Sequence, residues 1–363
     1  MSRIVLPDFP WDSLAEVKAI AQAHPGGVVD LSIGTPVDPV PAGIQDALAS
    51  VSEIPGYPTT HGIPALRAAA IAALGRRHGV TGIEPDAVLP TIGSKEAVAW
   101  LPRLLGFGPG DLVVIPELAY PTYEVGALLA GASILRADGL TALGPQKPAM
   151  IWLNSPSNPT GRVLGVEHLR KVVEWARERD VVVVSDECYL ALGWETEPLS
   201  ILHPEVSGGR TDGLIAVHSL SKSANLASYR AGFLTGDPRL IAGLLEVRKH
   251  AGMIVPRPVQ EAMVAALTDD EALVAQRERY ARRRLVLRKA LVDNGFRVDH
   301  SEAGLYLWST RDEEARDTVA WLAERGILVA PGTFYGPAGS RHVRIALTAT
   351  DERIDTAVER LTA

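Results

Sequence analysis

Short apolar runs alternate with amphipathic stretches between about residues 85 and 245, and this alternation constrains the fold more than any other feature of the chain. The intervening stretches, such as GVEHLRKVVEWARERD at 165–180, carry apolar residues at helical spacing. Continuous apolar strands separated by helices predict an α/β fold with a mostly parallel sheet covered by helices on both faces. The runs are AVLPTI (87–92), LVVIP (112–116), AMIWL (149–153), VVVVS (181–185), LIAVH (214–218) and AGFLTG (231–236).

The pattern changes after about residue 246, where a long helical stretch leads into FRVDHSEAGLYLWST at 296–310. A helix and two short strand-like runs follow, which is typical of a smaller α+β domain. We expect the Pro- and Gly-rich N-terminal segment to return to that domain and complete it. The predicted division is an arm at 1–40, a large domain at 41–245 and a small domain at 246–363, and a chain of 363 residues has room for two domains.

Composition excludes several classes of function. The formal net charge of −7 argues against a protein that binds nucleic acid or anionic membranes, and the basic run at 277–289 fits a solvated helix face. A single cysteine, Cys188, excludes an internal disulfide and a thiolate zinc cluster. The N-terminus has no uninterrupted apolar segment of the signal-peptide kind, so we expect a cytoplasmic protein without a metal.

Polar groups follow five of the apolar runs. In parallel α/β sheets, ligands bind beyond the carboxyl ends of the strands, which is where these groups stand. A small-residue turn that begins a helix follows the first run, and helix N-termini bind anions. Each signal is weak by itself, but their common position at one edge of the sheet predicts a site. The groups are Gly93, Ser94 and Lys95, then Tyr120 and Tyr123, the turn NSPSNPTGR at 154–162, Asp186 and Tyr189, and finally Ser219, Ser221, Lys222 and Arg230.

These groups suit one cofactor. The helix start at Gly93–Lys95, with Ser219, Ser221 or Arg230, suits a phosphate. Tyr120 can supply an aromatic platform for a flat ring, Asp186 a buried carboxylate for a protonated ring nitrogen, and Lys222 an amine nucleophile. Together they describe a site for pyridoxal 5′-phosphate, whose lysine and aspartate partners form a recognised pair.

Four motifs carry a resemblance to a known family: NSPSNPTGRV (154–163), SDECY (185–189), SLSKSANLASYRAGF (219–233) and HVRIALT (342–348). In this order and spacing they resemble the fold-type I pyridoxal-phosphate aminotransferases of class I/II, with an aspartate aminotransferase-like fold, over nearly the whole chain. Four further stretches resemble the actinobacterial succinyldiaminopimelate aminotransferases of lysine biosynthesis. These are FPWDSL (9–14), LSIGTPVDPVP (31–41), GYPTTHGIPALR (56–67) and KHAGMIVP (249–256).

The resemblance implies a role for each site residue. Lys222 would form the Schiff base and carry the proton between substrate Cα and cofactor, and Asp186 would pair with the ring nitrogen. Asn158 and Tyr189 would bond the phenolic oxygen, and Tyr120 would stack on the ring. Arg344 would bind the substrate carboxylate, with Asn158 and a backbone contact from Gly34 beside it. Phosphate ligands would be Ser94, Lys95, Ser219 and Arg230, with Tyr57 from a partner subunit of a homodimer.

The predicted reaction moves an amino group from glutamate to N-succinyl-2-amino-6-ketopimelate and yields N-succinyl-LL-2,6-diaminopimelate. Alternatives are an aminotransferase for aspartate or alanine, a β-lyase, and a cofactor-binding regulatory protein without turnover. A dinucleotide-dependent dehydrogenase is disfavoured because no G-x-G-x-x-G follows the early strands. We expect the distal carboxylates to meet Val37–Pro39 or Arg248–His250, and we interpret Tyr123, Cys188, His61 and His218 as structural.

Overall fold

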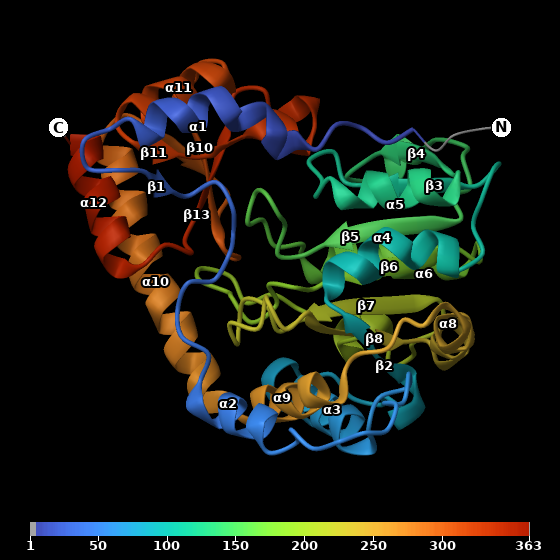
Figure 1. The fold of residues 1–363 in the computed structure, drawn as a ribbon. Coiled ribbons are helices and arrows are strands. Elements are labelled where there is room, and N and C mark those ends of the chain that lie inside the picture. Colours follow the sequence, from blue (N-terminus) through green and yellow to red (C-terminus); the bar gives the residue numbers. More distant parts are fainter. Residues whose placement is uncertain (1–4, 363) are drawn as a thin grey trace.

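A seven-stranded sheet forms the larger part of the molecule, which we describe from a computed structural model covering residues 5–362. The strand order is β2-β8-β7-β6-β5-β3-β4, and every neighbouring pair is parallel except those that involve β8. This arrangement confirms the predicted mostly parallel sheet (Figure 1). The strands are β2 (Val88–Ile92), β3 (Leu112–Ile115), β4 (Ser133–Arg136), β5 (Met150–Asn154), β6 (Val182–Asp186), β7 (Leu214–Ser219) and β8 (Ala231–Gly236).

One edge strand, β4, is missing from the predicted runs. Its residues Ser133–Arg136 are exposed or half-buried, because β4 has only β3 as a neighbour. An edge strand that keeps one polar side does not read as a continuous apolar run.

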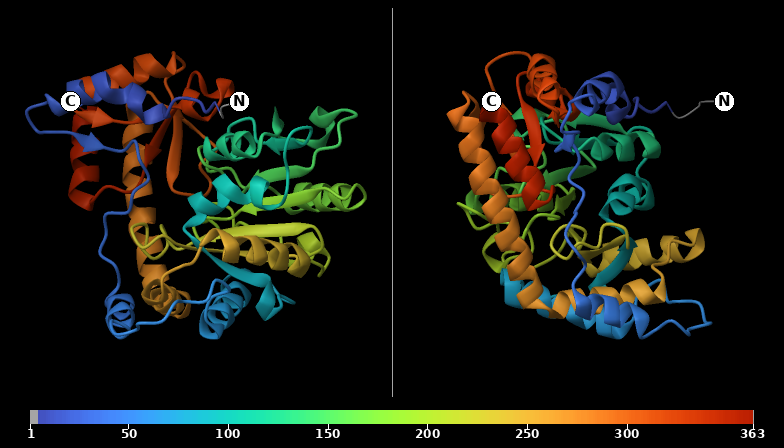
Figure 2. Two further views of the ribbon diagram at one scale, coloured as in Figure 1. Left: turned by 45° about the vertical axis from the view of Figure 1, so that its right-hand side comes forward. Right: turned by 60° about the vertical axis from the view of Figure 1, so that its left-hand side comes forward.

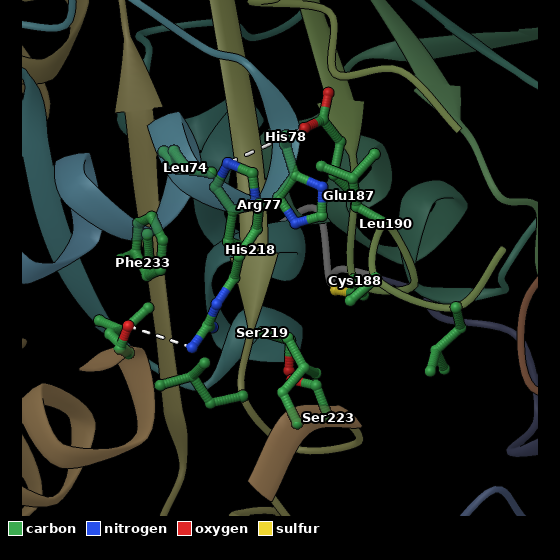
Figure 3. A pocket seen from close by; sticks show the side chains of 16 residues that line it. Leu74, Arg77, His78, Glu187, Cys188, Leu190, His218, Ser219, Ser223 and Phe233 are labelled. Atoms are coloured by element: carbon green, nitrogen blue, oxygen red, sulfur yellow. Dashed lines mark hydrogen bonds and ion pairs between the residues drawn. The ribbon is translucent and has the colours of Figure 1, made fainter. Parts of the chain in front are cut away.

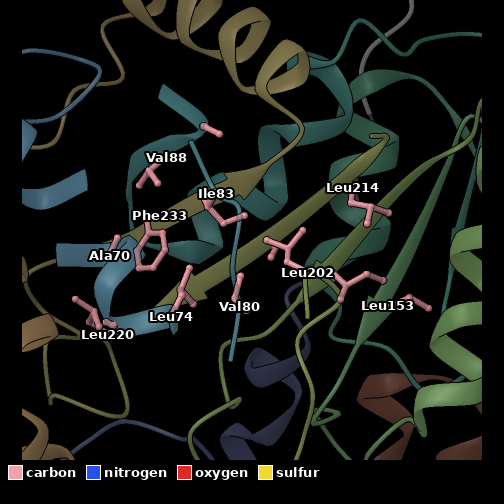
Figure 4. Packing of buried hydrophobic residues seen from close by; sticks show 14 of the residues in the cluster. Ala70, Leu74, Val80, Ile83, Val88, Leu153, Leu202, Leu214, Leu220 and Phe233 are labelled. Atoms are coloured by element: carbon pink, nitrogen blue, oxygen red, sulfur yellow. The ribbon is translucent and has the colours of Figure 1, made fainter. Parts of the chain in front are cut away.

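Helices cover both faces of the sheet, because the side chains of each strand alternate between them. Trp152 of β5 packs in a cluster with α4, α5 and α8, whereas Leu153 packs in the cluster of the opposite face (Figure 4). Each covering helix turns one apolar face toward the sheet. In α6, the apolar residues that recur at helical spacing are buried: Leu169, Val172, Val173 and Ala176. These helices are α2 (Ala42–Ala49), α3 (Pro64–His78), α4 (Ser94–Leu104), α5 (Thr122–Ala130), α6 (Val166–Arg177), α7 (Pro204–Ser207), α8 (Pro238–Ala251) and α9 (Arg257–Thr268).

A four-stranded antiparallel sheet, in the order β12-β13-β10-β9, forms the smaller part. The N-terminal segment joins it, since β1 (Val29–Asp30) pairs in parallel with β11 (Ile327–Leu328) and α1 (Ala15–Gln22) lies against α11. Its other elements are α10 (Asp270–Asp293), β9 (Arg297–Asp299), β10 (Tyr306–Thr310), α11 (Ala315–Glu324), β12 (Ala330–Pro331), β13 (Val343–Ala346) and α12 (Asp351–Thr362). Short 3₁₀ turns complete the chain: η1 (Pro10–Leu14), η2 (Pro85–Ala87), η3 (Leu140–Leu143), η4 (Gly332–Tyr335) and η5 (Pro337–Gly339).

The long helix α10 connects the two parts and runs along one side of the molecule (Figure 2). In α9, the helix that precedes α10 in the sequence, Ala262 and Met263 pack into the core of the seven-stranded sheet. Near the C-terminal end of α10, Leu287 and Ala290 pack into the core of the smaller part. We therefore propose that the domain boundary lies within α10, later than residue 246. Within residues 5–362, no helix is both long and apolar enough to cross a membrane.

Candidate active site

The carboxyl ends of β5, β6 and β7 face the smaller part of the molecule (Figure 1). A cavity of about 670 Å³ lies there. Nearly all the predicted site residues line it: Gly34, Ser94, Lys95, Tyr120, Asn158, Asp186, Tyr189, Ser219, Ser221, Lys222, Arg230 and Arg344. Tyr57 does not line it, because its side chain is fully exposed on the loop between α2 and α3. The residues come from both sheets, so the site requires the two parts of the chain to pack together.

Asp186 ends β6 as a buried carboxylate. The Tyr123 hydroxyl donates a 2.7 Å hydrogen bond to Oδ2, and the Cys188 backbone N–H donates a 3.1 Å bond to Oδ1. Among residues 5–362, no cationic side chain pairs with this carboxylate, and burial raises its pKa. A protonated ring nitrogen would supply the missing positive charge, because a buried carboxylate is costly without a partner.

Lys222 follows β7 and turns its amine into the cavity. Its Nζ donates a hydrogen bond to the Gly34 carbonyl, and Tyr280 Oη donates a 3.3 Å bond to the Lys222 backbone carbonyl. Burial lowers the pKa of the Lys222 amine, because a charge is poorly solvated there. A neutral amine is the nucleophilic form of lysine, so this position suits attack on an aldehyde.

An anion cradle lies at the N-terminus of α4, where unpaired backbone N–H groups favour negative charge. Gly93, just before the helix, has φ +73°, and a Cβ placed there would lie 2.3 Å from Arg230 Nη2. Arg230 is held by a 2.8 Å bond from Nη1 to the Ala227 carbonyl. The glycine thus leaves room for a guanidinium directly beside the helix start. A helix terminus with an arginine fits the phosphate of pyridoxal 5′-phosphate.

Lys95 is the exception within this cradle. It stands in the first turn of α4, but its Nζ lies 5.6 Å from the centre of the Phe9 ring. Its side chain is exposed and directed toward the N-terminal segment. Only the Lys95 backbone N–H lies at the helix start, so its predicted phosphate contact stays a prediction that concerns the main chain.

Arg344, on β13, is 2 % exposed. Its Nη1 donates to Asn158 Oδ1 at 2.9 Å, its Nη2 donates to the Ser32 carbonyl at 2.7 Å, and Nε has no partner. The guanidinium lies 3.9 Å from the ring centre of Tyr306. No carboxylate pairs with it in the described part of the chain. A buried arginine without an anion is a site for a carboxylate of a ligand.

Tyr306 is a site residue that the sequence reasoning missed. Its hydroxyl lies 3.1 Å from the Tyr189 hydroxyl, and its ring packs on Arg344. A Cβ at Gly34 would lie 2.3 Å from the Tyr306 hydroxyl, which explains why position 34 is glycine. Tyr306 stands in the apolar run LYLW at 305–308, so nothing local distinguishes it from a core residue.

Two residues that we interpreted as structural reach the site. Tyr123 is fully buried, and its ring stacks on Trp152 at 4.8 Å as packing predicts, but its hydroxyl also holds Asp186. Cys188 is half-buried and lines the cavity together with Asp186 and Tyr189. The chain turns after β6 and no longer alternates as a strand does. Burial and the nearby Asp186 raise the pKa of the Cys188 thiol.

The structure does not place the expected contacts for distal carboxylates at the cavity, because none of the residues Val37–Pro39 and Arg248–His250 lines it. Arg248 is fully buried and pairs with Glu96 at 2.8 Å, so it cannot reach the cavity. Asp38 pairs with Arg283 at 2.6 Å and is itself an anion. Both residues serve packing between elements that are distant in sequence, which no local pattern reveals.

Aromatic side chains of the N-terminal segment line the mouth of the cavity. Phe9 and Trp11 lie 5.5 Å apart between ring centres, and Trp11 and Phe334 lie 5.4 Å apart. Phe334 belongs to the smaller part of the molecule, in η4. The mouth therefore presents apolar rings, with Lys95 beside them.

Comparison with known proteins agrees with this geometry. The family described as "Aminotransferase class I and II" matches residues 26–361. A probable aminotransferase of Mycobacterium tuberculosis is 67% identical over 98% of the chain and 85% of its own length. The 4-dedimethylamino-4-oxo-anhydrotetracycline transaminase OxyQ of Streptomyces rimosus is 58% identical over 98% of the chain and 99% of its own. A solved structure, a probable N-succinyldiaminopimelate aminotransferase of Thermus thermophilus, is 30% identical, with a TM-score of 0.87 over 97% of the chain and 99% of its own.

Proposed function

The chain belongs to the class I and II aminotransferases, and we propose that it transfers the amino group of glutamate to N-succinyl-2-amino-6-ketopimelate. Pyridoxal 5′-phosphate is the cofactor. The proposed product, N-succinyl-LL-2,6-diaminopimelate, belongs to lysine and diaminopimelate biosynthesis. One observation carries the choice of a long acidic substrate: the cavity has Arg344 buried in its wall and, at its mouth, the Lys95 ammonium group, which pairs with no carboxylate among residues 5–362.

Bound pyridoxal phosphate supplies an aldehyde and an electron-withdrawing ring. In the proposal, Lys222 Nζ accepts the proton that leaves the substrate Cα, and its lowered pKa keeps it ready to do so. Asp186 holds the ring nitrogen, and Tyr123 with the Cys188 backbone N–H orients Asp186. Arg344 binds the substrate α-carboxylate through its guanidinium.

The other predicted residues hold the cofactor in this proposal. Asn158 and Tyr189 would bond its phenolic oxygen, and Tyr120 would stack on its ring. The start of α4, Ser219 and Arg230 would hold its phosphate. Lys95 takes part there through its backbone N–H, which leaves its ammonium group for the distal carboxylates of the substrate.

A second candidate follows from the aromatic mouth. Phe9, Trp11 and Phe334 offer apolar rings on which a flat polycyclic substrate could stack. The OxyQ relative is named as a transaminase of such a compound. The observation that separates the candidates is charge: Lys95 favours an acidic chain, and the aromatic rings favour a neutral planar one.

A substrate comparison tests the proposal. The purified enzyme would be given N-succinyl-LL-diaminopimelate, aspartate, alanine and a planar aromatic amine as donors to 2-oxoglutarate. We expect the succinylated substrate to have the highest kcat/KM. A tenfold advantage for aspartate, alanine or the aromatic amine, about 1.4 kcal/mol in transition-state binding, would refute the acidic substrate and leave the aminotransferase chemistry intact.

The variant Lys95→Gln tests whether the Lys95 ammonium group selects the acidic substrate. It removes the ammonium group and keeps the backbone N–H at the helix start. We expect kcat/KM for the succinylated substrate to fall by about tenfold while alanine turnover and cofactor affinity stay unchanged. Lys249→Gln, at an exposed lysine paired with Glu246, is the matched control. An equal loss for all substrates together with weaker cofactor binding would instead make Lys95 a phosphate ligand.

We also propose a homodimer in the cytoplasm. Tyr57 is fully exposed, and Ile54 on the same loop is 39% exposed, as expected of residues that meet a partner. In this assembly the Tyr57 hydroxyl reaches the phosphate of the partner subunit's site.

A further inference from the structure

A second, smaller cavity of about 50 Å³ lies behind the ends of β6 and β7 (Figure 3). Glu187, His218 and His78 line it together with apolar side chains. Cys188 and Ser219 line both this cavity and the large one, so the two are separated only by the strand ends. The chemistry proposed above uses none of the Glu187, His218 and His78 side chains.

Three polar atoms of this cavity are buried without a hydrogen-bond partner among residues 5–362: Glu187 Oε2, His218 Nε2 and His78 Nδ1. The other Glu187 oxygen, Oε1, already accepts a 2.7 Å bond from the Ile201 N–H. His218 Nε2 lies 3.9 Å from Glu187 Oε2, which is too long for a direct hydrogen bond. Buried polar atoms are almost always satisfied by protein or by ordered water.

We propose that this cavity binds an ordered water molecule that bridges Glu187 Oε2 and His218 Nε2, with His78 Nδ1 as a third partner. A buried water needs about 10–15 Å³ and two to four polar partners, and the cavity exceeds this volume. When two polar atoms lie farther apart than a direct hydrogen bond allows, a water molecule between them can bond to both.

The charges at the cavity favour a neutral occupant. Burial lowers the pKa of His218 to about 3 and that of His78 to about 4, so both imidazoles are neutral near pH 7. Burial raises the pKa of Glu187 to about 7. Arg77 also lines the cavity, but it pairs with Asp270 at 2.6 Å and needs no ligand there. Water can donate a hydrogen bond to one partner and accept one from another, which a monatomic ion cannot do, and a cavity of about 50 Å³ suits so small an occupant.

The bridge would position the cofactor site from behind. Glu187 follows Asp186 directly, and its backbone N–H donates to the Val217 carbonyl at 2.9 Å. His218 directly precedes Ser219, and its ring stacks on Phe233 at 4.8 Å. A water held between the two side chains thus ties the end of β6 to the end of β7. Glu187 and His218 are positioning residues that act through Asp186 and Ser219.

The first test is a crystal structure of the holoenzyme at a resolution that shows water. We expect a water peak at hydrogen-bond distance, about 2.7–3.2 Å, from both Glu187 Oε2 and His218 Nε2. A direct contact between these two atoms, or an empty cavity at that resolution, would overturn the proposal.

The second test uses His218→Phe, which keeps a ring against Phe233 and removes Nε2. We expect the water to be lost and the dissociation constant of pyridoxal phosphate, measured by absorbance titration, to rise about tenfold, as expected for loss of one buried hydrogen bond. His218→Gln restores a polar atom near Nε2 and should recover most of that affinity. His250→Phe, at an exposed histidine of α8, is the control and should bind as wild type does.

Circular dichroism and thermal melts establish that each variant is folded before the comparison. Equal cofactor affinity in folded His218→Phe and wild type would refute the positioning role. Equal loss of affinity in His218→Phe and His218→Gln would also refute it, because the effect would then come from the imidazole and not from a bridged water. Both outcomes are independent of which keto acid the enzyme uses.

Discussion

Arg344 is a buried cation whose two Nη groups bond Asn158 and the Ser32 carbonyl, while Tyr306 covers its face. These contacts orient the guanidinium plane, and a lysine cannot reproduce a planar fork of donors. We expect Arg344→Lys to lower kcat/KM for every amino-acid substrate alike, by roughly 2–5 kcal/mol in transition-state binding. Steady-state kinetics with alanine, aspartate and the succinylated donor would measure it. A loss confined to one substrate would show that Arg344 binds a side-chain group instead.

The buried Glu187 carboxyl should make the free energy of unfolding depend on pH. Its pKa is raised from 4.5 to about 7 in the folded protein, so the folded state keeps a proton that the unfolded state loses. That contribution is fully present below pH 4.5 and is lost as the pH rises through about 7. Glu187→Gln keeps an acceptor for the Ile201 N–H and cannot ionise.

We therefore expect wild type and Glu187→Gln to have similar urea midpoints near pH 4 and to diverge as the pH rises to 8, with the variant more stable. The difference should reach the order of 3 kcal/mol in the free energy of unfolding. Urea titrations at several pH values would measure it. A difference that does not change with pH would mean that Glu187 ionises normally in the folded chain.

At the scale of the element, a substitution at the start of α4 tests the anion cradle. Gly93→Ala would place a Cβ 2.3 Å from Arg230 Nη2 and strain a residue with φ +73°. We expect the guanidinium to move away and the dissociation constant of pyridoxal phosphate to rise by at least about tenfold, as expected for loss of a charge-assisted bond. Absorbance titration of the apoenzyme would measure this change.

Gly106→Ala is the matched control, because Gly106 follows the same helix with φ +88° and has open space around it. Both variants place an alanine at positive φ, which costs on the order of 1–3 kcal/mol, so a loss of cofactor affinity confined to Gly93→Ala reports on Arg230. Equal cofactor affinity in both variants would exclude Arg230 from the phosphate site.

At the scale of the whole molecule, the proposed dimer can be tested by complementation. Subunits with Tyr57→Phe would be mixed with subunits with Lys222→Ala at limiting cofactor. If sites are shared, one site of each hybrid dimer combines Lys222 with the partner subunit's Tyr57 and is intact. We expect the mixture to be more active than the sum of the separate variants, and sedimentation to show a dimer. No gain on mixing, or an active monomer, would refute the shared site.

Much of the site was predictable because its residues stand in local motifs. Apolar runs indicated the strands that end at Asn154, Asp186 and Ser219, and the turns after the first and the last of these strands carried Asn158 and Lys222. Parallel strands deliver the residues at their carboxyl ends to one edge, so the order of these runs was enough to predict a common site. The mostly parallel sheet and its pyridoxal phosphate chemistry follow from that pattern.

Only the tertiary structure decided the residues whose role depends on contacts between distant elements. Tyr123 reads as core and yet holds Asp186, and Tyr306 reads as strand and yet covers Arg344. Arg248 reads as a surface cation and is buried against Glu96. Short-range periodicity reports which face of an element is buried, because burial along one element follows its own repeat. The partner that a buried polar group meets is set by the packing of other elements, which that repeat does not contain.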